Sequence, residues 1–382
     1  MRIAFVADVA YPWINGGMER MQYLEAKELA RKHDVHFFCI RWESMKSEFK
    51  YDGITYHAFP AWKHSKLYKK GRRSIREALL FAIGLVRIFR YRFDMVEVHM
   101  FPIMHLPVVK AYCRLTGCKL LMEVAEVWDK QYWQGYLGKV KGSIGYAYQR
   151  YAINGADFYI SNPQLQGKMR KYGVSSDRIK VFTPSVDGRE IDRIKAVRRR
   201  KRIVIVARLI KEKRIDKWLK IFKKVKEKVP DVEGMIVGRG PERETLEGMI
   251  REMGLGDSVV LRDIYYDIKE MYKAVKSSSM LLHMSEREGL SLITIESLAL
   301  GTPVVLPSYT PIPGELKSMC VVEDEKDIPK KIVEILNSRN PRSYIKNSEK
   351  LKEFMLSSTS EFYEQLFEKL NGGSRDSGSV KH

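Results

Sequence analysis

Residues 286–305 read Glu286-Arg-Glu-Gly-Leu-Ser-Leu-Ile-Thr-Ile-Glu296-Ser-Leu-Ala-Leu-Gly-Thr-Pro-Val-Val305. The spacing of the apolar residues predicts a loop at Gly289, then a helix that stops at Gly301-Thr-Pro, then a strand. The N-terminus of such a helix offers unpaired backbone N–H groups and a positive dipole to a phosphate. Glu288 precedes the helix and Glu296 lies inside it, and carboxylates accept hydrogen bonds from sugar hydroxyls. The segment therefore predicts a site for a molecule that joins phosphate to polyols, such as a nucleotide sugar.

Short apolar runs alternate with stretches of helical period on both sides of this segment. Such alternation predicts parallel sheets covered by helices on both faces, which is the doubly wound α/β class. We expect strands at Ile3–Ala7, Val35–Ile40, Ile54–His57, Met95–His99, Lys119–Val124, Phe158–Ser161, Ile179–Phe182, Arg202–Val206, Val232–Val237, Ser258–Leu261, Met280–His283 and Pro303–Leu306. We expect helices at Met18–Lys32, Ser74–Tyr91, Ile103–Leu115, Ile144–Ile153, Pro163–Tyr172, Ile215–Lys228, Glu242–Met253, Ile268–Val275 and Ser291–Leu300.

The pattern breaks near residue 190 and then restarts, which indicates two domains. We expect two Rossmann-like domains, at 1–190 and 191–345. A helical segment at 346–370 is expected to pack back toward the first domain, and 371–382 are expected to form a flexible tail. Since ligands bind beyond the carboxyl ends of parallel strands, we expect the two domains to face each other across a cleft.

Composition narrows the class of protein. The chain has 382 residues, of which 45% are hydrophobic and 11% aromatic, so it can build packed cores and does not read as disordered. Its longest apolar run, Leu79–Val86, is far shorter than the roughly 20 residues that span a bilayer. The N-terminus reads as a buried strand rather than a signal peptide. We therefore expect a cytoplasmic protein.

Further motifs accompany the two glutamates. Arg208-Leu-Ile-Lys-Glu-Lys213 follows the first predicted strand of the second domain, Gly238-Arg-Gly240-Pro follows the next, and Gly16-Gly-Met-Glu19 follows the first strand of the chain. Together with the Glu-x7-Glu spacing they resemble the signature of family 4 retaining glycosyltransferases, which have the GT-B fold. The resemblance is collinear over most of residues 1–320.

The resemblance implies a donor site in the second domain, in which Arg208 and Lys213 grip the pyrophosphate of the donor. Arginine suits bidentate phosphate binding and lysine supplies a point charge. The candidate donor-binding residues are Arg208, Lys213, Gly238, Arg239, Glu288, Gly289, Leu290 and Glu296, and the candidate glycine loop of the first domain is Gly16, Gly17 and Glu19.

For several of these residues a purely structural interpretation stays open. The two cations can be solvated surface residues, and the Gly16-Gly17 pair can be a tight turn. The Gly238–Gly240 turn lacks the third glycine of a dinucleotide fingerprint and reads mainly as structural.

Candidate catalytic residues are Glu288, Glu126 and His99. The segment Glu123-Val-Ala-Glu126-Val-Trp128 is similar to a Glu-Val-Arg-Asp-Leu-Trp subgroup that glycosylates polyprenyl-linked acceptors, with Ala125-Glu126 in place of Arg-Asp. Glu126 either accepts the proton of the acceptor hydroxyl or holds a neighbouring cation. His99 ends a predicted strand, where it is either a second candidate for that proton transfer or a packing residue.

The resemblance also implies retaining, hexosyltransferase-type chemistry with a UDP-, GDP- or ADP-linked sugar. Its transition state is oxocarbenium-like, and cations and a helix N-terminus would stabilise the leaving diphosphate. No Asp-x-Asp motif stands in a suitable place, so we expect no metal and no cofactor. The four cysteines, Cys39, Cys113, Cys118 and Cys320, lack metal-type spacing and are interpreted as structural thiols.

The formal net charge is +21, and the segment Lys63–Arg92 holds ten basic residues and one acid, Glu77. An apolar stripe follows the same segment: Leu67, Ile75, Leu79, Ile83, Val86 and Phe89. Such a stretch can lie on an anionic bilayer, so we expect a peripheral protein at the inner face of the membrane, with a lipid or lipid-linked glycan as acceptor. The alternative is that the stripe is the core face of the predicted helix.

Three other functions compete with this interpretation. A soluble sugar or polysaccharide acceptor is the alternative within the family. A sugar-nucleotide epimerase shares the two-domain design but lacks the combination of motifs. A nucleic-acid-binding protein is suggested by charge alone, and since no recognition motif is present, we expect no nucleic acid partner.

Overall fold

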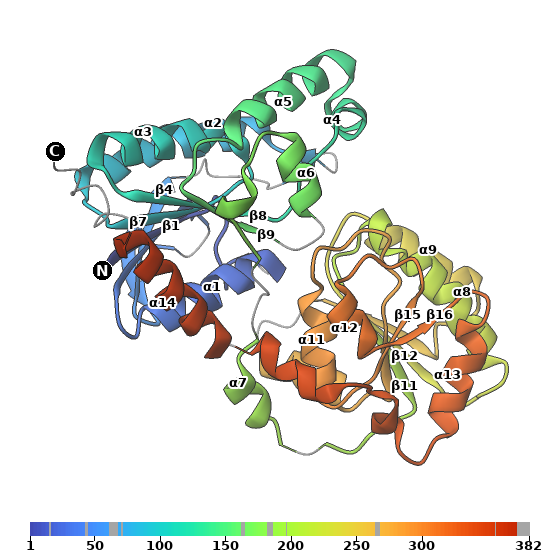
Figure 1. The fold of residues 1–382 in the computed structure, drawn as a ribbon. Coiled ribbons are helices and arrows are strands. Elements are labelled where there is room, and N and C mark those ends of the chain that lie inside the picture. The colour runs from blue at the N-terminus through green and yellow to red at the C-terminus, as the bar shows by residue number, and fades with distance from the viewer. Residues whose placement is uncertain are drawn as a thin grey trace. The chain divides into compact units, whose positions relative to one another are not determined.

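Two parallel sheets organise the chain, each in a compact unit of its own (Figure 1). The computed structural model describes all residues except 15–16, 43–44, 61–67, 70–71, 162–164, 182–185, 196, 264–267, 356 and 373–382. The first unit comprises Met1–Thr183 and Leu356–His382, and the second comprises Pro184–Met355. The predicted α/β class, with two doubly wound halves, is confirmed.

The first unit is built on an eight-stranded sheet in the order β10-β9-β8-β7-β1-β2-β4-β3. Neighbouring strands run parallel except β3, which pairs antiparallel with β4. The strands are β1 (Arg2–Val6), β2 (Asp34–Arg41), β3 (Glu48–Tyr51), β4 (Ile54–Pro60), β7 (Met95–His99), β8 (Lys119–Val124), β9 (Phe158–Ser161) and β10 (Ile179–Val181), with β5 (Tyr68–Lys69) and β6 (Arg72–Arg73) as a separate antiparallel pair.

Helices cover both faces of this sheet. They are α1 (Gly17–Leu29), α2 (Ile75–Gly84), η1 (Leu85–Arg90), η2 (Ile103–His105), α3 (Leu106–Thr116), α4 (Lys130–Leu137), α5 (Lys139–Ala152), α6 (Gln166–Lys171), η4 (Ser176–Arg178) and α14 (Ser357–Gly372). The side chains of α1 and α14 pack in one core, which includes Leu24 and Tyr363. Those of α2, η1, α3 and the end of α5 pack in another, which includes Phe81, Val109 and Ala152. Because alternate residues of a strand point to opposite faces, the two cores lie on opposite sides of the sheet.

The second unit has a six-stranded, fully parallel sheet in the order β13-β12-β11-β14-β15-β16. Its strands are β11 (Arg202–Val206), β12 (Glu233–Val237), β13 (Val259–Arg262), β14 (Met280–Leu282), β15 (Val304–Pro307) and β16 (Val321–Glu323). Its helices are α7 (Gly188–Asp192), η5 (Lys211–Lys213), α8 (Ile215–Lys226), α9 (Arg243–Glu252), α10 (Ile268–Lys276), α11 (Leu292–Ala299), α12 (Gly314–Ser318), α13 (Ile328–Asn337), η6 (Pro341–Tyr344) and η7 (Ser348–Phe354).

The chain leaves the first unit seven residues before the predicted boundary at 190 and returns to it after Met355. The short helix α7 belongs to the second unit because Val186, Ile191 and Ile194 are buried in its core. Phe354 is buried in the same core, so the second unit extends about ten residues past the predicted end at 345. The remaining C-terminal segment forms α14, whose Tyr363, Leu366 and Phe367 are buried in the first unit.

The predicted helix Ser74–Tyr91 is wrong in its second half, where the chain forms the 3₁₀ helix η1. Ser74 caps the start of α2 by accepting a hydrogen bond from the amide of Glu77 at 3.3 Å. The change of helix type falls at Gly84, where a Cβ would lie only 3.0 Å from the Phe59 ring. In the part of the chain that the structure describes, no helix is long and apolar enough to cross a membrane.

Candidate active site

The loop after β14 and the turn after β11 are joined by hydrogen bonds. The amide of Glu286 donates to the carbonyl of Glu212 at 3.0 Å, and Ser285 Oγ donates to the same carbonyl at 3.3 Å. The two segments meet because β11 and β14 are parallel neighbours, so both end at the same edge of the sheet. This arrangement brings Lys213 on η5 next to Glu288 on the loop.

Glu288 forms a buried ion pair with Lys213. Nζ of Lys213 lies 2.5 Å from Oε1 of Glu288, and the two side chains are 14% and 11% exposed. Nε2 of His283 lies 3.0 Å from the same oxygen. Burial acts to raise the pKa of Glu288, but the charge of Lys213 and the contact with His283 outweigh it and lower the pKa to about 2. Glu288 is therefore an anion at neutral pH.

His283 is the residue that the sequence did not single out. It was expected only as the end of a strand, yet it directly follows β14 and its side chain is almost fully buried beside Glu288. The available signal was a histidine at the carboxyl end of a buried strand, the same signal that identified His99.

The helix α11 begins at Leu292, four residues after Glu288. Ser291 adopts the left-handed backbone conformation (φ 65°) just before the helix, and its Oγ lies 2.8 Å from Oγ1 of Thr294. Glu296, in the middle of the helix, is 2% exposed and accepts a hydrogen bond from the Tyr272 hydroxyl at 3.0 Å. Gly289 and Leu290, between the loop and the helix, are half-buried. The two glutamates of the motif thus occupy different environments, one paired with an ammonium and one beside a phenol.

Arg208 and Lys213 also occupy different environments, although both follow β11. Arg208 is exposed, whereas Lys213 is largely buried in the pair with Glu288. The edge of the sheet therefore carries an exposed guanidinium and an ammonium that is paired with Glu288.

The turn Gly238-Arg239-Gly240 packs directly on the backbone that follows β11. A Cβ at Gly238 would lie 1.8 Å from the carbonyl oxygen of Ala207, and one at Gly240 would lie 2.3 Å from that of Leu209. The amide of Leu209 donates to the carbonyl of Arg239 at 2.8 Å. Both glycines are thus required by the close approach of two backbone segments. The side chain of Arg239 forms a half-exposed ion pair with Asp263 at 3.1 Å.

The glycine loop of the first unit is only partly described. Gly16 lies outside the described residues, Gly17 is the exposed first residue of α1, and Glu19 is half-buried in its first turn. The loop connects the carboxyl end of β1 to α1, which is the position predicted for it.

Glu126 lies in the loop after β8 and is held by an aromatic neighbour. The indole N–H of Trp128 donates to Oε2 of Glu126 at 2.6 Å. Gln149 on α5 fixes the loop through its side-chain amide group. The nitrogen of this group donates to the backbone carbonyl of Trp128 at 2.8 Å. Its oxygen accepts from the backbone N–H of Trp128 at 3.3 Å and from the indole N–H of Trp133 at 3.1 Å. A carboxylate held this firmly is suited to contact one position of a bound substrate.

His99 is the last residue of β7, the strand next to β8. Its Nδ1 lies 2.7 Å from the carbonyl oxygen of Phe101, and its own carbonyl oxygen lies 3.0 Å from Nε2 of His105. Since β7 and β8 are parallel, His99 and the loop of Glu126 lie at the same edge of the first sheet. That edge therefore carries both candidates for acid–base chemistry in this unit.

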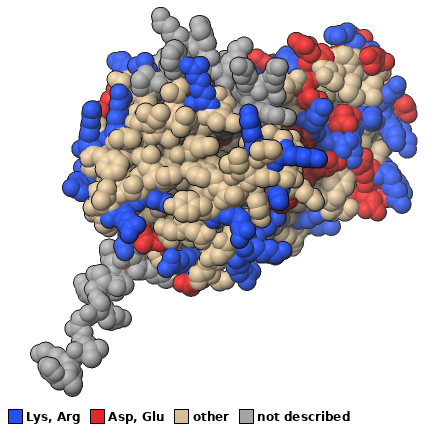
Figure 2. Space-filling view, turned by 90° about the horizontal axis from the view of Figure 1, so that it is seen from above, with Lys and Arg blue, Asp and Glu red and all other residues tan. Residues whose placement is uncertain are grey.

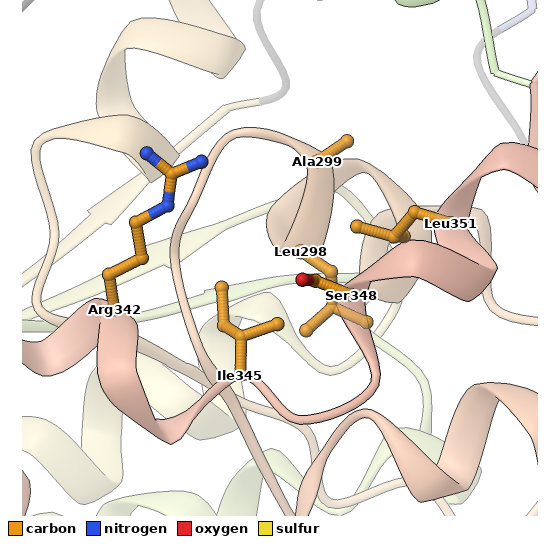
Figure 3. A pocket seen from close by; sticks show the side chains of 6 residues that line it. All are labelled: Leu298, Ala299, Arg342, Ile345, Ser348 and Leu351. Atoms are coloured by element: carbon orange, nitrogen blue, oxygen red, sulfur yellow. The ribbon is translucent and has the colours of Figure 1, made fainter.

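Two cavities of the second unit lie away from Glu288. The smaller, of about 250 Å³, lies beside the C-terminal half of α11 and is lined by Leu298, Ala299, Arg342, Ile345, Ser348 and Leu351 (Figure 3). The larger, of about 820 Å³, is lined in part by the basic run Arg198–Arg202 that leads into β11. Neither includes a residue of the predicted donor site. Among the described residues, no group of three or more His, Cys, Asp and Glu side chains is arranged to hold a metal ion.

Two family models match adjacent parts of the chain. The model described as Glycosyltransferase Family 4 matches residues 15–190, and the model described as Glycosyl transferases group 1 matches residues 188–352. The first match covers the sheet of the first unit from the loop after β1 onward. The second covers nearly all of the second unit.

Curated relatives match over shorter stretches. An uncharacterized glycosyltransferase of Haemophilus influenzae is 30% identical over 156 residues, which are 39% of this chain and 43% of the relative. A GDP-mannose-dependent alpha-(1-6)-phosphatidylinositol monomannoside mannosyltransferase of Mycolicibacterium smegmatis is 30% identical over 140 residues, which are 35% of this chain and 36% of the relative. The chain thus matches less than half the length of these relatives.

Solved structures resemble the whole chain. The crystal structure of Anabaena Alr3699/HepE in complex with UDP and glucose has a TM-score of 0.72 at 14% identity and covers 97% of this chain and 100% of that one. Sucrose-phosphate synthase from Thermosynechococcus elongatus has a TM-score of 0.73 at 16% identity, covering 97% and 99%. At these identities the likeness shows the fold, which is the predicted GT-B fold.

Proposed function

The chain belongs to the family 4 glycosyltransferases, and we propose that it is a retaining hexosyltransferase with a nucleotide-sugar donor and a lipid or lipid-linked glycan as acceptor. A UDP-, GDP- or ADP-linked sugar is the donor class. The names of similar proteins support it, since the Anabaena protein has been solved with UDP and with UDP-glucose and the Mycolicibacterium relative is named for GDP-mannose.

The observation that carries the proposal is the pair of Glu288 and Lys213 just before the N-terminus of α11. When the bond between sugar and nucleotide breaks, negative charge develops on the leaving diphosphate. Lys213, Arg208 and the free N–H groups of α11 would stabilise that charge, so the proposed reaction uses neither a metal nor a cofactor. Glu288, with its lowered pKa, would accept a hydrogen bond from a sugar hydroxyl and stabilise the positive charge of an oxocarbenium-like sugar.

The remaining proposed donor contacts are inferred from where each residue lies in the second unit. Glu296 would bind the ribose hydroxyls, with Tyr272 orienting its carboxylate. Gly289 and Leu290 would offer backbone N–H groups, and Gly238 and Arg239 would lie beside the base. In the first unit, the predicted glycine loop of Gly16, Gly17 and Glu19 is proposed as a further ligand-binding segment.

Glu126 is the proposed proton acceptor for the acceptor hydroxyl. The hydrogen bond from Trp128 holds its carboxylate in one orientation, and a carboxylate held in place can accept the proton of a bound hydroxyl. His99, at the same edge of the sheet, is the second candidate for this step.

The apolar stripe of α2 and η1 supports a reaction at the inner face of a membrane. Ile75, Leu79, Ile83, Val86 and Phe89 are between 42% and 61% exposed, so the alternative that they form the core face does not hold for them. The core face of these helices is instead Ala78, Phe81, Ala82, Leu85 and Ile88. Leu67, the first residue of the predicted stripe, lies outside the described residues.

A panel of UDP-, GDP- and ADP-linked sugars tests the donor side by thermal shift and donor hydrolysis. We expect one nucleotide class to raise the melting temperature and to be hydrolysed slowly. Glu296→Ala should weaken donor binding, and Glu288→Ala should chiefly slow transfer. Glu286→Ala, on the same loop but exposed, is the matched control. No response to any nucleotide sugar, or equal activity in all three variants, would refute the donor site.

An acceptor screen with the responding donor separates the two acceptor classes. Transfer to polyprenyl-linked or membrane lipids supports the proposal. Transfer to soluble sugars or polysaccharide alone would instead establish the alternative acceptor class.

A further inference from the structure

One face of the first sheet carries a layer of helices whose outward side is unusually apolar. The layer consists of α2, η1, α3 and α5, whose inward residues share one core. Its helices are in contact, since Lys110 on α3 donates to the carbonyl of Ala152 at the end of α5 at 2.6 Å and its Nζ lies 5.6 Å from the centre of the Tyr151 ring. We call this set of helices the helical layer.

Large apolar side chains project from the layer outside the segment 63–92. Leu115 on α3 is 75% exposed, and Val140, Ile144 and Tyr151 on α5 are 74%, 65% and 73% exposed. They add to the exposed stripe of α2 and η1 on the same side of the sheet. Figure 2 shows a broad surface without charge, edged by Lys and Arg side chains. Large apolar side chains that gather on one exposed face often mark a binding surface.

The charge of the two helix layers differs in sign. The helical layer holds eight basic residues and one acid: Arg76, Arg87, Arg90, Lys110, Arg114, Lys139, Lys141 and Arg150 against Glu77. The helices α1 and α14 on the opposite face hold five acids outside the core, Glu19, Glu28, Glu361, Glu364 and Glu368, against the three bases Arg20, Lys27 and Lys369, and the buried Glu25 is not counted. The first unit is therefore polarised, with the apolar side being also the basic side.

We propose that the helical layer as a whole is the face by which the first unit lies on an anionic bilayer, with α5 as a second contact element beside α2 and η1. Leu115, Val140, Ile144 and Tyr151 enter the boundary between headgroups and acyl chains, and the surrounding lysines and arginines contact lipid phosphates. A second copy of the chain fits this face poorly, because pairing two such faces would oppose like charges. The inference rests on the proposed function in one respect, since it names the membrane surface at which the acceptor is reached.

Flotation with vesicles tests the face directly. The full chain is mixed at low salt with vesicles of phosphatidylcholine containing about one third phosphatidylglycerol, and with phosphatidylcholine vesicles alone. We expect the wild type to float with the anionic vesicles and to be released by high salt. The double variant V140E/I144E should lower the partition coefficient at least tenfold. The matched control is V260E/V322E, which places the same substitutions at exposed valines of the second unit and should float like the wild type.

Three results would overturn the proposal. They are a wild type that stays at the bottom of the gradient, a V140E/I144E variant that floats as well as the wild type, and a wild type that dimerises in solution through this face and loses the dimer in the variant. A melting temperature of V140E/I144E within a few degrees of that of the wild type shows that this variant is folded. If its melting temperature is lower than that, the milder variant I144S is used in its place. Failure of the donor panel with intact flotation would refute the proposed function and leave the docking face standing.

Discussion

The ammonium of Lys213 lies 2.5 Å from Oε1 of Glu288, and both side chains are removed from most of the solvent. Removing one partner of a buried pair leaves the other charge uncompensated, which typically costs about 3–5 kcal/mol. The pair is therefore both a candidate for chemistry and a structural link between the turn after β11 and the loop after β14.

Lys213→Met should lower the free energy of unfolding at pH 7 by about 3 kcal/mol or more. The pKa of Glu288 in the folded protein, about 2, lies below its ordinary value of 4.5. Its ionisation therefore stabilises the fold above pH 4.5, and this contribution is lost as the pH falls toward 2. Urea denaturation at pH 7 and pH 3 should show a smaller difference between wild type and variant at the lower pH. Lys211→Met, an exposed lysine of the same turn, is the control. Equal losses in the two variants would contradict this account.

Trp128→Phe should slow transfer about tenfold, an effect that corresponds to about 1.4 kcal/mol. The substitution keeps an aromatic ring but removes the N–H that holds Glu126. The KM for the donor should stay unchanged, because donor contacts are proposed for the second unit. Trp133→Phe is a close control, because it also removes one indole N–H near Glu126. That N–H donates to Gln149 and not to Glu126. Steady-state kinetics of both variants decide: a greater loss of kcat in Trp133→Phe would mean that Trp128 does not position Glu126.

Glu97→Gln should stabilise the protein at alkaline pH. Burial raises the pKa of Glu97 to about 8, and the hydroxyl of Tyr363 donates to its Oε2 at 2.6 Å. Two further buried carboxylates, Glu25 and Glu123, have pKa values raised well above normal by burial and by Glu97. The stability that protonated Glu97 contributes is complete below pH 4.5 and is lost as the pH rises to about 8.

The gain from Glu97→Gln should therefore grow between pH 5 and pH 8, to on the order of 2 kcal/mol, as measured by chemical denaturation. Glu364→Gln, an exposed carboxylate of α14 paired with Lys32, should show no such growth. A gain that is independent of pH would show that Glu97 is ionised in the folded protein.

Gly238→Ala should destabilise the second unit by several kcal/mol, because the new Cβ would collide with the carbonyl oxygen of Ala207. Gly248→Ala is the matched control, since it lies within α9 and nothing stands within 4 Å of its Cβ position. It should stabilise the helix by about 0.5–1 kcal/mol. Melting temperatures of the two variants that move in the same direction would refute the packing argument.

The sequence predicted the strands that carry the site well, because buried parallel strands are short, apolar runs with few alternatives. Met95–His99, Lys119–Val124 and Arg202–Val206 have the predicted bounds. β3 and α4 were missed. β3 is an exposed edge strand, Glu48-Phe-Lys-Tyr51, with little apolar signal, and α4, Lys130–Leu137, mixes polar and aromatic residues without a clear period.

Side-chain environment was harder to predict than element type. The stripe from Ile75 to Phe89 has helical spacing that fits either a core face or an exposed face, and only the packing of Phe81 and Leu85 against the sheet decides between them. Likewise Glu97 lies within a strand of apolar residues, and nothing local indicates that a tyrosine more than 260 residues later meets it. The residues of the donor motif could be named in advance, but the contact of His283 with Glu288 could not. The catalytic roles stay predictions.

The return of the chain to the first unit has a consequence for the order of events during synthesis. A ribosome delivers residues 184–355, a continuous unit, before it delivers α14, whose Tyr363, Leu366 and Phe367 complete a core begun by β1 and α1. The second unit can thus finish folding while the first still lacks α14 over part of one side of its sheet, next to the carboxylates Glu25, Glu97 and Glu123. During that interval the nascent N-terminal half would be the part of the protein that chaperones and proteases recognise, and the emergence of α14 from the ribosome would end it.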